Sequence, residues 1–156
     1  MNNRTKDNMR TEKQAIEYLR KLNFYSCTLI QKKKILELLG IDQKYKNSFD
    51  MVKFDSDQCF TEASEIDEKL VSKMTLVEVK SSSRNLAVTL EGYYFSLQER
   101  EEELASNIKV KMIFVFVVIP RNGNETFHQI WTFKQIMENA KSVRIQKNIT
   151  LKRLDV

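Results

Sequence analysis

Glu78 and Lys80 are the residues of this chain whose types and spacing most clearly indicate chemistry. They stand two positions apart in the segment TLVEVKS at 75–81, where the residue pattern predicts a β-strand. Because alternate side chains of a strand share a face, the carboxylate and the ammonium should lie side by side, with Val77 and Val79 on the other face. A charged pair in such apolar surroundings has to be paired or bound to a metal.

A second carboxylate, that of Asp50, begins the preceding predicted strand, FDMVKFD at 49–55. If the two strands are neighbours, the Asp50 carboxylate can meet Glu78. Two carboxylates suit Mg²⁺, which prefers oxygen ligands and takes its remaining ligands from water and substrate phosphate. The metal would polarise a phosphoryl oxygen and activate a water, while Lys80 would orient that water or neutralise developing charge. These residues therefore predict hydrolysis of phosphodiester bonds.

The same acidic-x-Lys string occurs twice more, at Asp42-Gln43-Lys44 and at Asp67-Glu68-Lys69. Neither copy has the apolar neighbours of a buried strand, so only Glu78-Val79-Lys80 is expected to form a site. A plain ion pair between Glu78 and Lys80, in a protein of purely structural function, is the alternative.

The positioning elements are predicted from periodicity, capping residues and turn residues. Helices are expected at 12–22 (capping box Thr11 and Gln14, stop at Asn23), 29–39 (stop at Gly40), 63–71, 96–105 (capping box Ser96 and Glu99) and 133–139. Strands are expected at 49–55, 75–81, 86–95, 110–119 and 126–131, the last two joined by a turn at 121–124. This order predicts an α/β fold in which helices flank a central mixed β-sheet. Residues 56–74 are expected to be an insertion or long connection.

Glu12 in the first predicted helix is a further candidate. At about 100° per residue it lies within roughly 40° of Ile16 and 20° of Leu19, which places it on the inward face. Glu17, about 140° from Glu12, is expected to face solvent. An inward Glu at a helix start could complement the helix dipole, or it could reach the metal site as a ligand or supporting base.

Length and composition limit the class of protein. The 156 residues suit one domain spanning 1–156, and 42% hydrophobic with 30% charged residues is typical of a globular chain. The longest apolar run, 112–120, is about half as long as a membrane-spanning helix, and the N-terminus lacks a signal peptide's apolar core. We therefore expect a soluble, cytoplasmic protein with no membrane partner. Two Cys without CxxC spacing and a single His disfavour zinc, haem and His-dependent hydrolase sites.

These residues resemble the signature of the PD-(D/E)xK nuclease superfamily. Its pattern is a Glu in the first helix, an Asp beginning a strand and Glu-x-Lys in the next strand. The matching positions are Glu12 in TEKQAIEYLRKLNF, Asp50 in NSFDMVKFD, and Glu78 and Lys80 in TLVEVKSSS. The spacing from Glu12 to Phe24 is similar to that of archaeal Holliday-junction resolvases. LVEVKSSS followed by GYYFSLQEREEELA and KMIFVFVV is similar to restriction-type nuclease domains.

The resemblance covers most of residues 10–135 and departs from the family pattern at two points. Phe49 replaces the usual Pro before Asp50, and 27 residues separate Asp50 from Glu78. The length of this connection leaves Asp55 or Asp57 as an alternative to Asp50 at the metal.

The resemblance implies a restriction-endonuclease-like fold and a magnesium-dependent endonuclease acting on DNA. Mg²⁺, for which Mn²⁺ can substitute, would be the sole cofactor, with Asp50, Glu78 and Val79 as its ligands. Lys80 and Glu12 would assist catalysis, and Gln98 is a weak further candidate. A homodimer is also implied. The choice between DNA and RNA, the specificity, internal or terminal cleavage and the biological role stay open. The main alternative is a non-catalytic nucleic-acid-binding module of the same fold.

Basic residues that flank the predicted site in sequence are candidates for sequence-independent phosphate contacts, although each could be an ordinary surface charge. With Ser81, the candidates are Lys32, Lys33, Lys34, Lys44, Lys46 and Arg84. Further basic residues lie in the C-terminal segment, namely Lys141, Arg144, Lys147, Lys152 and Arg153. Four aromatic residues could stack on bases or belong to the core, namely Tyr45, Tyr93, Tyr94 and Trp131.

Overall fold

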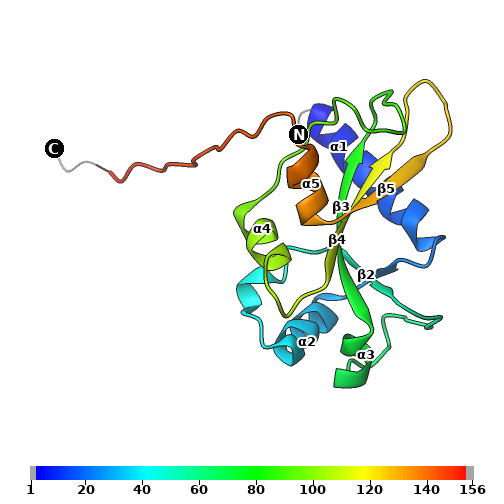
Figure 1. Cartoon of the computed structure of the whole chain (residues 1–156), viewed down its shortest axis with the longest axis vertical. Coiled ribbons are helices and arrows are strands. Elements are labelled where there is room, and N and C mark those ends of the chain that lie inside the picture. The colour runs from blue at the N-terminus through cyan, green and yellow to red at the C-terminus, as the bar shows by residue number, and fades with distance from the viewer. Residues whose placement is uncertain (1–2, 154–156) are drawn as a thin grey trace.

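The computed structural model describes residues 3–153. Its central feature is a five-stranded mixed sheet (Figure 1). Its strands follow the order β1 (Tyr25–Ser26), β2 (Met51–Phe54), β3 (Met74–Ser82), β4 (Met112–Val118) and β5 (Phe127–Trp131). Only β3 and β4 are parallel, whereas the other neighbouring strands are antiparallel. The parallel pair requires a crossover connection, which runs through one helix.

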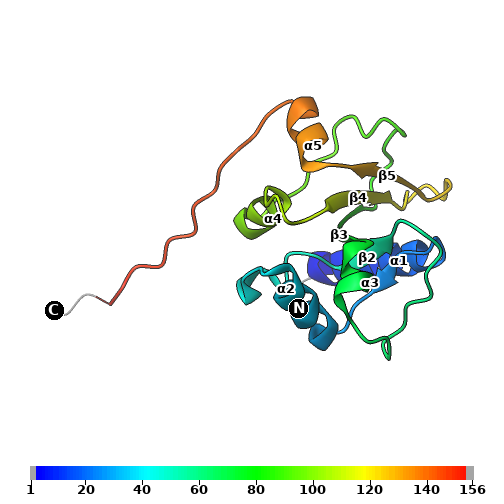
Figure 2. The same cartoon turned by 60° about the horizontal axis from the view of Figure 1, so that its bottom comes forward.

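Helices cover both faces of the sheet (Figure 2). Helix α1 packs on the face formed by Met51, Val77, Val79, Val115 and Val117. The other face carries Phe114, Phe116 and Leu76 and is covered by α2, α4 and α5. The helices are α1 (Asn3–Arg20), α2 (Leu29–Leu39), α3 (Glu68–Ser72), α4 (Glu99–Ala105) and α5 (Phe133–Asn139), with a 3₁₀ turn η1 (Gln43–Tyr45). The prediction of an α/β fold with a central mixed sheet is confirmed.

Helix α1 begins earlier than the sequence pattern predicted. The capping box of Thr11 with Gln14 is wrong, because Thr11 lies inside α1 and its hydroxyl donates to the carbonyl of Asp7 (2.9 Å). The predicted stop at Asn23 is confirmed, since Asn23 has a positive φ of 63° just beyond the helix. The Tyr18 hydroxyl lies 2.9 Å from His128 Nδ1, and this hydrogen bond ties α1 to β5.

The second helix and the last helix match their predictions. Helix α2 ends at Gly40, which has a φ of 68°. Glycine adopts this left-handed conformation without the steric penalty that a Cβ atom brings. Helix α5 begins after Thr132, whose side chain accepts from the amide of Gln135 (3.2 Å). Both predictions succeeded because the signals that end or begin these helices are local.

The predicted strand at 86–95 is wrong. The segment from 83 to 98 forms turns and irregular chain, and Leu90 within it has a φ of 60°. Its aromatic side chains serve packing, since Tyr93 and Phe95 both contact the ring of Phe116 at centroid distances of 5.2 and 5.0 Å. Aromatic residues that cover a sheet from a loop produce the same composition as a strand.

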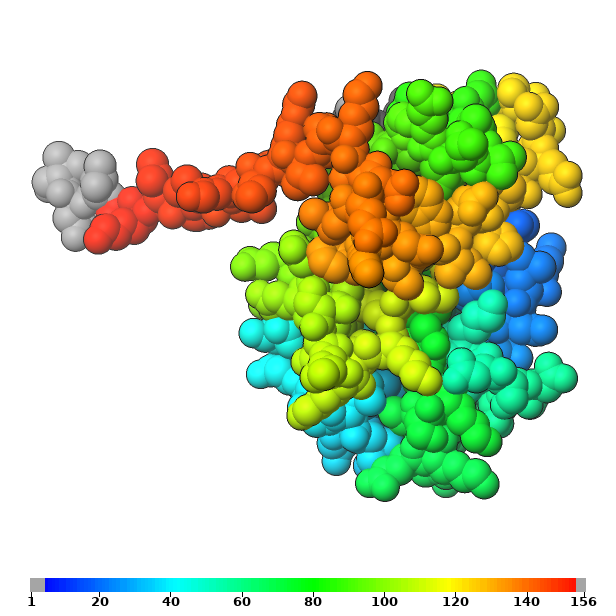
Figure 3. All heavy atoms as spheres, in the orientation of Figure 1, coloured from blue at the N-terminus to red at the C-terminus, as the bar shows by residue number. Residues whose placement is uncertain are grey.

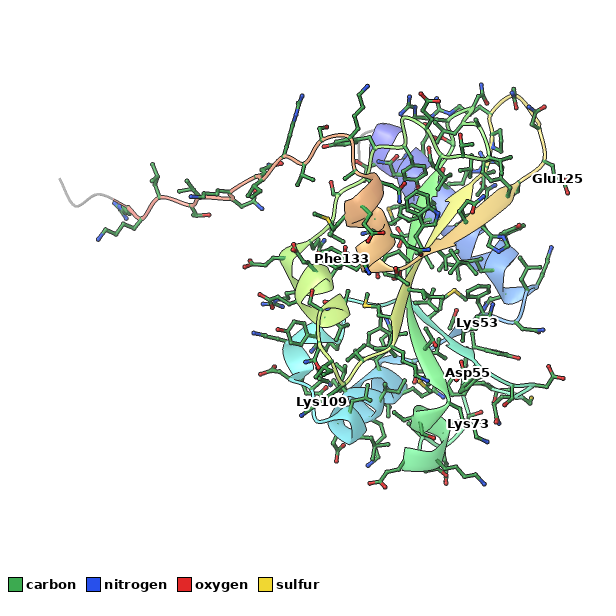
Figure 4. All side chains as sticks on the ribbon, in the orientation of Figure 1. Lys53, Asp55, Lys73, Lys109, Glu125 and Phe133 are labelled. Carbon is green, nitrogen blue, oxygen red and sulfur yellow. The ribbon has the colours of Figure 1, made fainter. Side chains whose placement is uncertain are left out.

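The long connection between β2 and β3 returns the chain so that these strands pair directly. It is anchored to the body by the buried Gln31, whose side-chain amide donates to the carbonyls of Thr61 (2.9 Å) and Ser64 (3.1 Å). Its helix, α3, begins at Glu68 instead of the predicted position 63. In Figure 4, Lys53, Asp55 and Lys73 lie near one another where the connection leaves β2 and re-enters β3. Across residues 3–153, every helix is too short or too polar to cross a membrane.

Candidate active site

Asp50 reaches β3 at the point where the pairing of β2 with β3 stops. Its main-chain amide donates to the carbonyl of Val77 (2.8 Å), and its carboxylate accepts from the amide of Val79 (2.8 Å). The side chain thus takes the place that a main-chain partner would have occupied. The N–H and C=O of a strand residue point to the same edge, so the carbonyl of Val79 also faces Asp50.

Glu78 and Lys80 lie on the same face of β3, as predicted, while Val77 and Val79 point to α1. The Lys80 ammonium is 3.3 Å from Glu78 Oε1. Glu78 is only 7% exposed, and its other carboxyl oxygen, Oε2, is buried without a hydrogen-bond partner among the described residues. An unpartnered buried oxygen of this kind is costly and needs a proton or a cation.

The environment of Glu78 disfavours its charged form. Burial, followed by the negative charge of Asp50, raises the pKa of Glu78 from 4.5 to about 10, although Lys80 acts in the opposite direction. Without a cation, these surroundings therefore favour the neutral form of the carboxyl group. The distances agree with a neutral Glu78, because the Lys80 ammonium lies closer to a different carboxylate than to Glu78.

That carboxylate belongs to Glu101, which is not among the predicted site residues. Glu101 lies in the first turn of α4, is 3% exposed, and places Oε2 2.8 Å from the Lys80 ammonium. The same oxygen accepts from the main-chain amide of Gln98 (3.1 Å), the residue that caps α4. Lys80 is therefore fixed between Glu78 and Glu101.

A signal for Glu101 does exist in the sequence. Leu97, Glu101 and Leu104 recur at the i, i+4 and i+7 spacing of one helix face, and Leu104 is buried. A Glu on the apolar face of a helix needs a cationic partner. The predicted capping box of Ser96 with Glu99 is wrong and hid this pattern, because it began the helix at the wrong residue.

The donors that could hold a divalent cation are all oxygen atoms. They are the carboxyl groups of Asp50 and Glu78 and the carbonyl of Val79, a donor set that suits Mg²⁺ better than a softer metal. Within residues 3–153, groups of three or more His, Cys, Asp or Glu side chains arranged to hold a metal are absent. A magnesium ion here would complete its shell with water and substrate oxygens.

Asp55 and Asp57 lie away from these donors. Strands β2 and β3 are antiparallel, so Asp50 lies at the Glu78 end of the pair, while the main-chain amide of Asp55 donates to the carbonyl of Lys73 (3.2 Å) at the opposite end. Both acidic residues are exposed and line an open hollow of about 610 Å³. Of the three aspartates considered, the structure brings Asp50 to Glu78.

Glu12 does not face inward, contrary to the prediction. Its side chain is exposed, and α1 packs on the sheet face opposite to Glu78 and Lys80. The helical phase was correct for Ala15 and Leu19, which are fully buried, but Glu12 is two turns before Leu19. In the described part of the chain, hydrogen bonds or ion pairs between Glu12 and the site residues are absent.

The two other acidic-x-Lys strings have ordinary structural roles. Asp42 caps η1 by accepting from the amide of Lys44 (2.8 Å), and Asp67 caps α3 by accepting from the amide of Leu70 (2.8 Å). All the charged residues of these strings are exposed. Gln98 is also exposed, and its contact with the site is made by its main-chain amide.

The predicted phosphate-binding residues are spread over three elements. Lys32, on α2, places its ammonium 5.5 Å from the ring centre of Phe49, next to Asp50, whereas Lys33 and Lys34 are exposed. In η1, the carbonyl of Lys44 accepts from Arg100 of α4 (3.2 Å). The remaining members are the half-buried Lys46 and Ser81 and the exposed Arg84.

Comparisons with family models, with curated proteins and with solved structures found no match for this chain.

Proposed function

We propose that this chain is a magnesium-dependent nuclease that hydrolyses phosphodiester bonds in DNA, acting as an endonuclease on a restriction-endonuclease-like fold. One observation carries the proposal: the Asp50 carboxylate bonds to Val79, the residue between Glu78 and Lys80, and lies near enough for its charge to act on Glu78. An ion pair that served stability alone would have no use for a second carboxylate beside a buried, unpartnered carboxyl oxygen.

The donor set fits a magnesium ion. A cation bound by Glu78 would take over the role of the proton on the buried carboxyl group and would satisfy its orphan oxygen. Asp50 would offer the carboxyl oxygen that does not bond to Val79, and the Val79 carbonyl faces the same edge. When bound, Mg²⁺ would polarise the scissile phosphate, activate a water and stabilise the leaving oxyanion.

Lys80 has the geometry of a group that contacts the reacting phosphate. An ammonium has three protons, of which two are directed at Glu78 and Glu101. The third remains for a water or for a phosphate oxygen on which negative charge develops. Because both carboxyl groups restrict the rotation of the side chain, the ammonium is held in place before substrate arrives, as electrostatic stabilisation of a transition state requires.

The experiment is a cleavage assay on supercoiled plasmid, linear duplex, single-stranded DNA and RNA with Mg²⁺ or Mn²⁺. We expect Glu78→Gln and Lys80→Ala each to lower the rate at least about 100-fold. The matched control is the exposed string in α3, where Glu68→Gln and Lys69→Ala should leave the rate unchanged. Cleavage that persists in both site variants would contradict the proposal.

A further inference from the structure

Most of the net positive charge of the chain lies outside the folded body, residues 1–140. Residues 141–156 contain five of the 26 Lys and Arg but only one of the 21 Asp and Glu, which leaves residues 1–140 with 21 against 20. We call residues 141–153 the basic tail. Its five cations equal in number the formal net charge of the whole chain, which is +5.

The basic tail leaves the body after α5 and extends away from it without helix or strand (Figures 1 and 3). All of its residues are exposed, and its cations are free of ion pairs within residues 3–153. At about 3.3 Å per residue, 13 residues can span roughly 40 Å. Fully solvated cations over such a length can contact many phosphates of a duplex, which carries one charge per about 1.7 Å of its axis.

The order of residues in the tail argues against docking on a flat apolar surface. In an extended chain, Val143, Ile145, Ile149 and Leu151 share one side, but Lys147 stands in the middle of that side. Arg144 and Lys152 project to the other side, and Figure 4 shows side chains leaving both sides of the tail. Cations on both sides suit a ligand that surrounds the chain with negative charge, such as a nucleic-acid groove.

The body carries an acidic segment at its opposite end. Residues 55–68 include six exposed acidic side chains and no Lys or Arg. Figure 1 shows α3, which follows this segment, at one end of the molecule and the start of the tail near the other end. A polyanion held by the tail would therefore lie away from the segment that repels it.

We infer that the basic tail is an arm that supplies most of the salt-dependent affinity for nucleic acid, while the nearly neutral body carries the chemistry. This inference rests on the proposed function for its choice of ligand. That ligand is the phosphate backbone of DNA, bound independently of base sequence. The arm binds the phosphates and raises the concentration of DNA at the site of Asp50 and Glu78.

The test measures the affinity for a fluorescent 30-base-pair duplex between 50 and 300 mM NaCl, in EDTA so that cleavage is excluded. In the full-length chain, the arm variant replaces all five cations with Gln: K141Q, R144Q, K147Q, K152Q and R153Q. The matched body control replaces five exposed cations in or next to the helices: K13Q, R20Q, K21Q, K69Q and K134Q. Each phosphate contact contributes about 0.9 to the slope of log affinity against log salt. We therefore expect the arm variant to lose about 4 from this slope and the body control less than about 1.

A third variant, V143S, I145S, I149S and L151S, should keep the wild-type slope. An arm variant with an unchanged slope would overturn the inference, and so would an aliphatic variant that loses as much affinity as the arm variant. Tighter binding of the wild-type protein to phosphatidylserine vesicles than to the duplex would also overturn it. Tail-dependent binding without cleavage in any metal would refute the proposed function but support the inference about the arm. Cleavage with a salt slope that does not depend on the tail would support the proposed function and refute the inference about the arm.

Discussion

Replacing Glu78 with Gln should make the metal-free protein less sensitive to rising pH. The pKa of Glu78 is about 10 in the folded chain, against 4.5 as its ordinary value, because burial and the charge of Asp50 disfavour the carboxylate. A group with a raised folded pKa contributes stability that is fully present below its unfolded pKa and is lost as pH rises toward its folded pKa. Between pH 6 and pH 8 the folded chain keeps a proton that the unfolded chain has lost.

The expected magnitude follows from this one proton. Relative to the Gln variant, the free energy of unfolding of the wild-type protein should fall by about 3 kcal/mol between pH 6 and pH 8. Gln has nearly the same shape but does not titrate, so the other ionisable groups cancel in the comparison. A loss of this size is a large part of the 5–15 kcal/mol that stabilises a typical domain.

The assay is urea unfolding of both proteins in EDTA at pH 6, 7 and 8, followed by circular dichroism. Added Mg²⁺ at pH 8 should restore more stability to the wild-type protein than to the Gln variant, because the variant lacks the charged Glu78 carboxylate as a ligand. Parallel stability curves in EDTA would refute the reasoning. They would mean that Lys80 holds Glu78 in its charged form and that the buried carboxyl group needs no cation.

Three further predictions concern Glu101, Glu12 and Asp50. Glu101→Ala should destabilise the fold by about 3 kcal/mol, because it leaves Lys80 with one buried partner. The same substitution should lower the cleavage rate about 10- to 100-fold at unchanged KM. Glu12→Ala should change stability by less than about 0.5 kcal/mol in urea unfolding and leave cleavage intact, whereas Leu19→Ala on the same helix should cost about 3 kcal/mol. Asp50→Asn should weaken Mn²⁺ binding at least about 10-fold by titration calorimetry, and equal affinity in both proteins would remove Asp50 from the ligand set.

The parts of the fold that could be predicted from the sequence are those fixed by local signals. Gly40 ends α2 and Thr132 begins α5 because one residue's backbone conformation or one side-chain oxygen decides each boundary. The shared face of Glu78 and Lys80 also follows from local geometry, since the period of a strand is two residues. These features do not depend on contacts with distant parts of the chain.

The parts that were missed depend on contacts between distant segments. The interaction of Glu101 with Lys80 joins residues 21 positions apart, and only the folded chain brings α4 to β3. The exposure of Glu12 depends on where the sheet ends beneath α1, which helical phase does not reveal. Tyr93 and Phe95 have the composition of a strand, but the pocket that they fill beside Phe116 is formed by tertiary structure.

The metal site can be tested directly by diffraction from crystals of the protein soaked in Mn²⁺, with data collected at the manganese absorption edge. We predict one anomalous peak in contact with Asp50 and Glu78, at about 2.1 Å from a carboxyl oxygen of each. The Lys80 ammonium should remain within hydrogen-bonding distance of Glu101. A peak bound by Asp55 and Asp57 instead, or an ordered site without any peak at saturating Mn²⁺, would contradict the assignment of these residues to a metal-dependent nuclease centre.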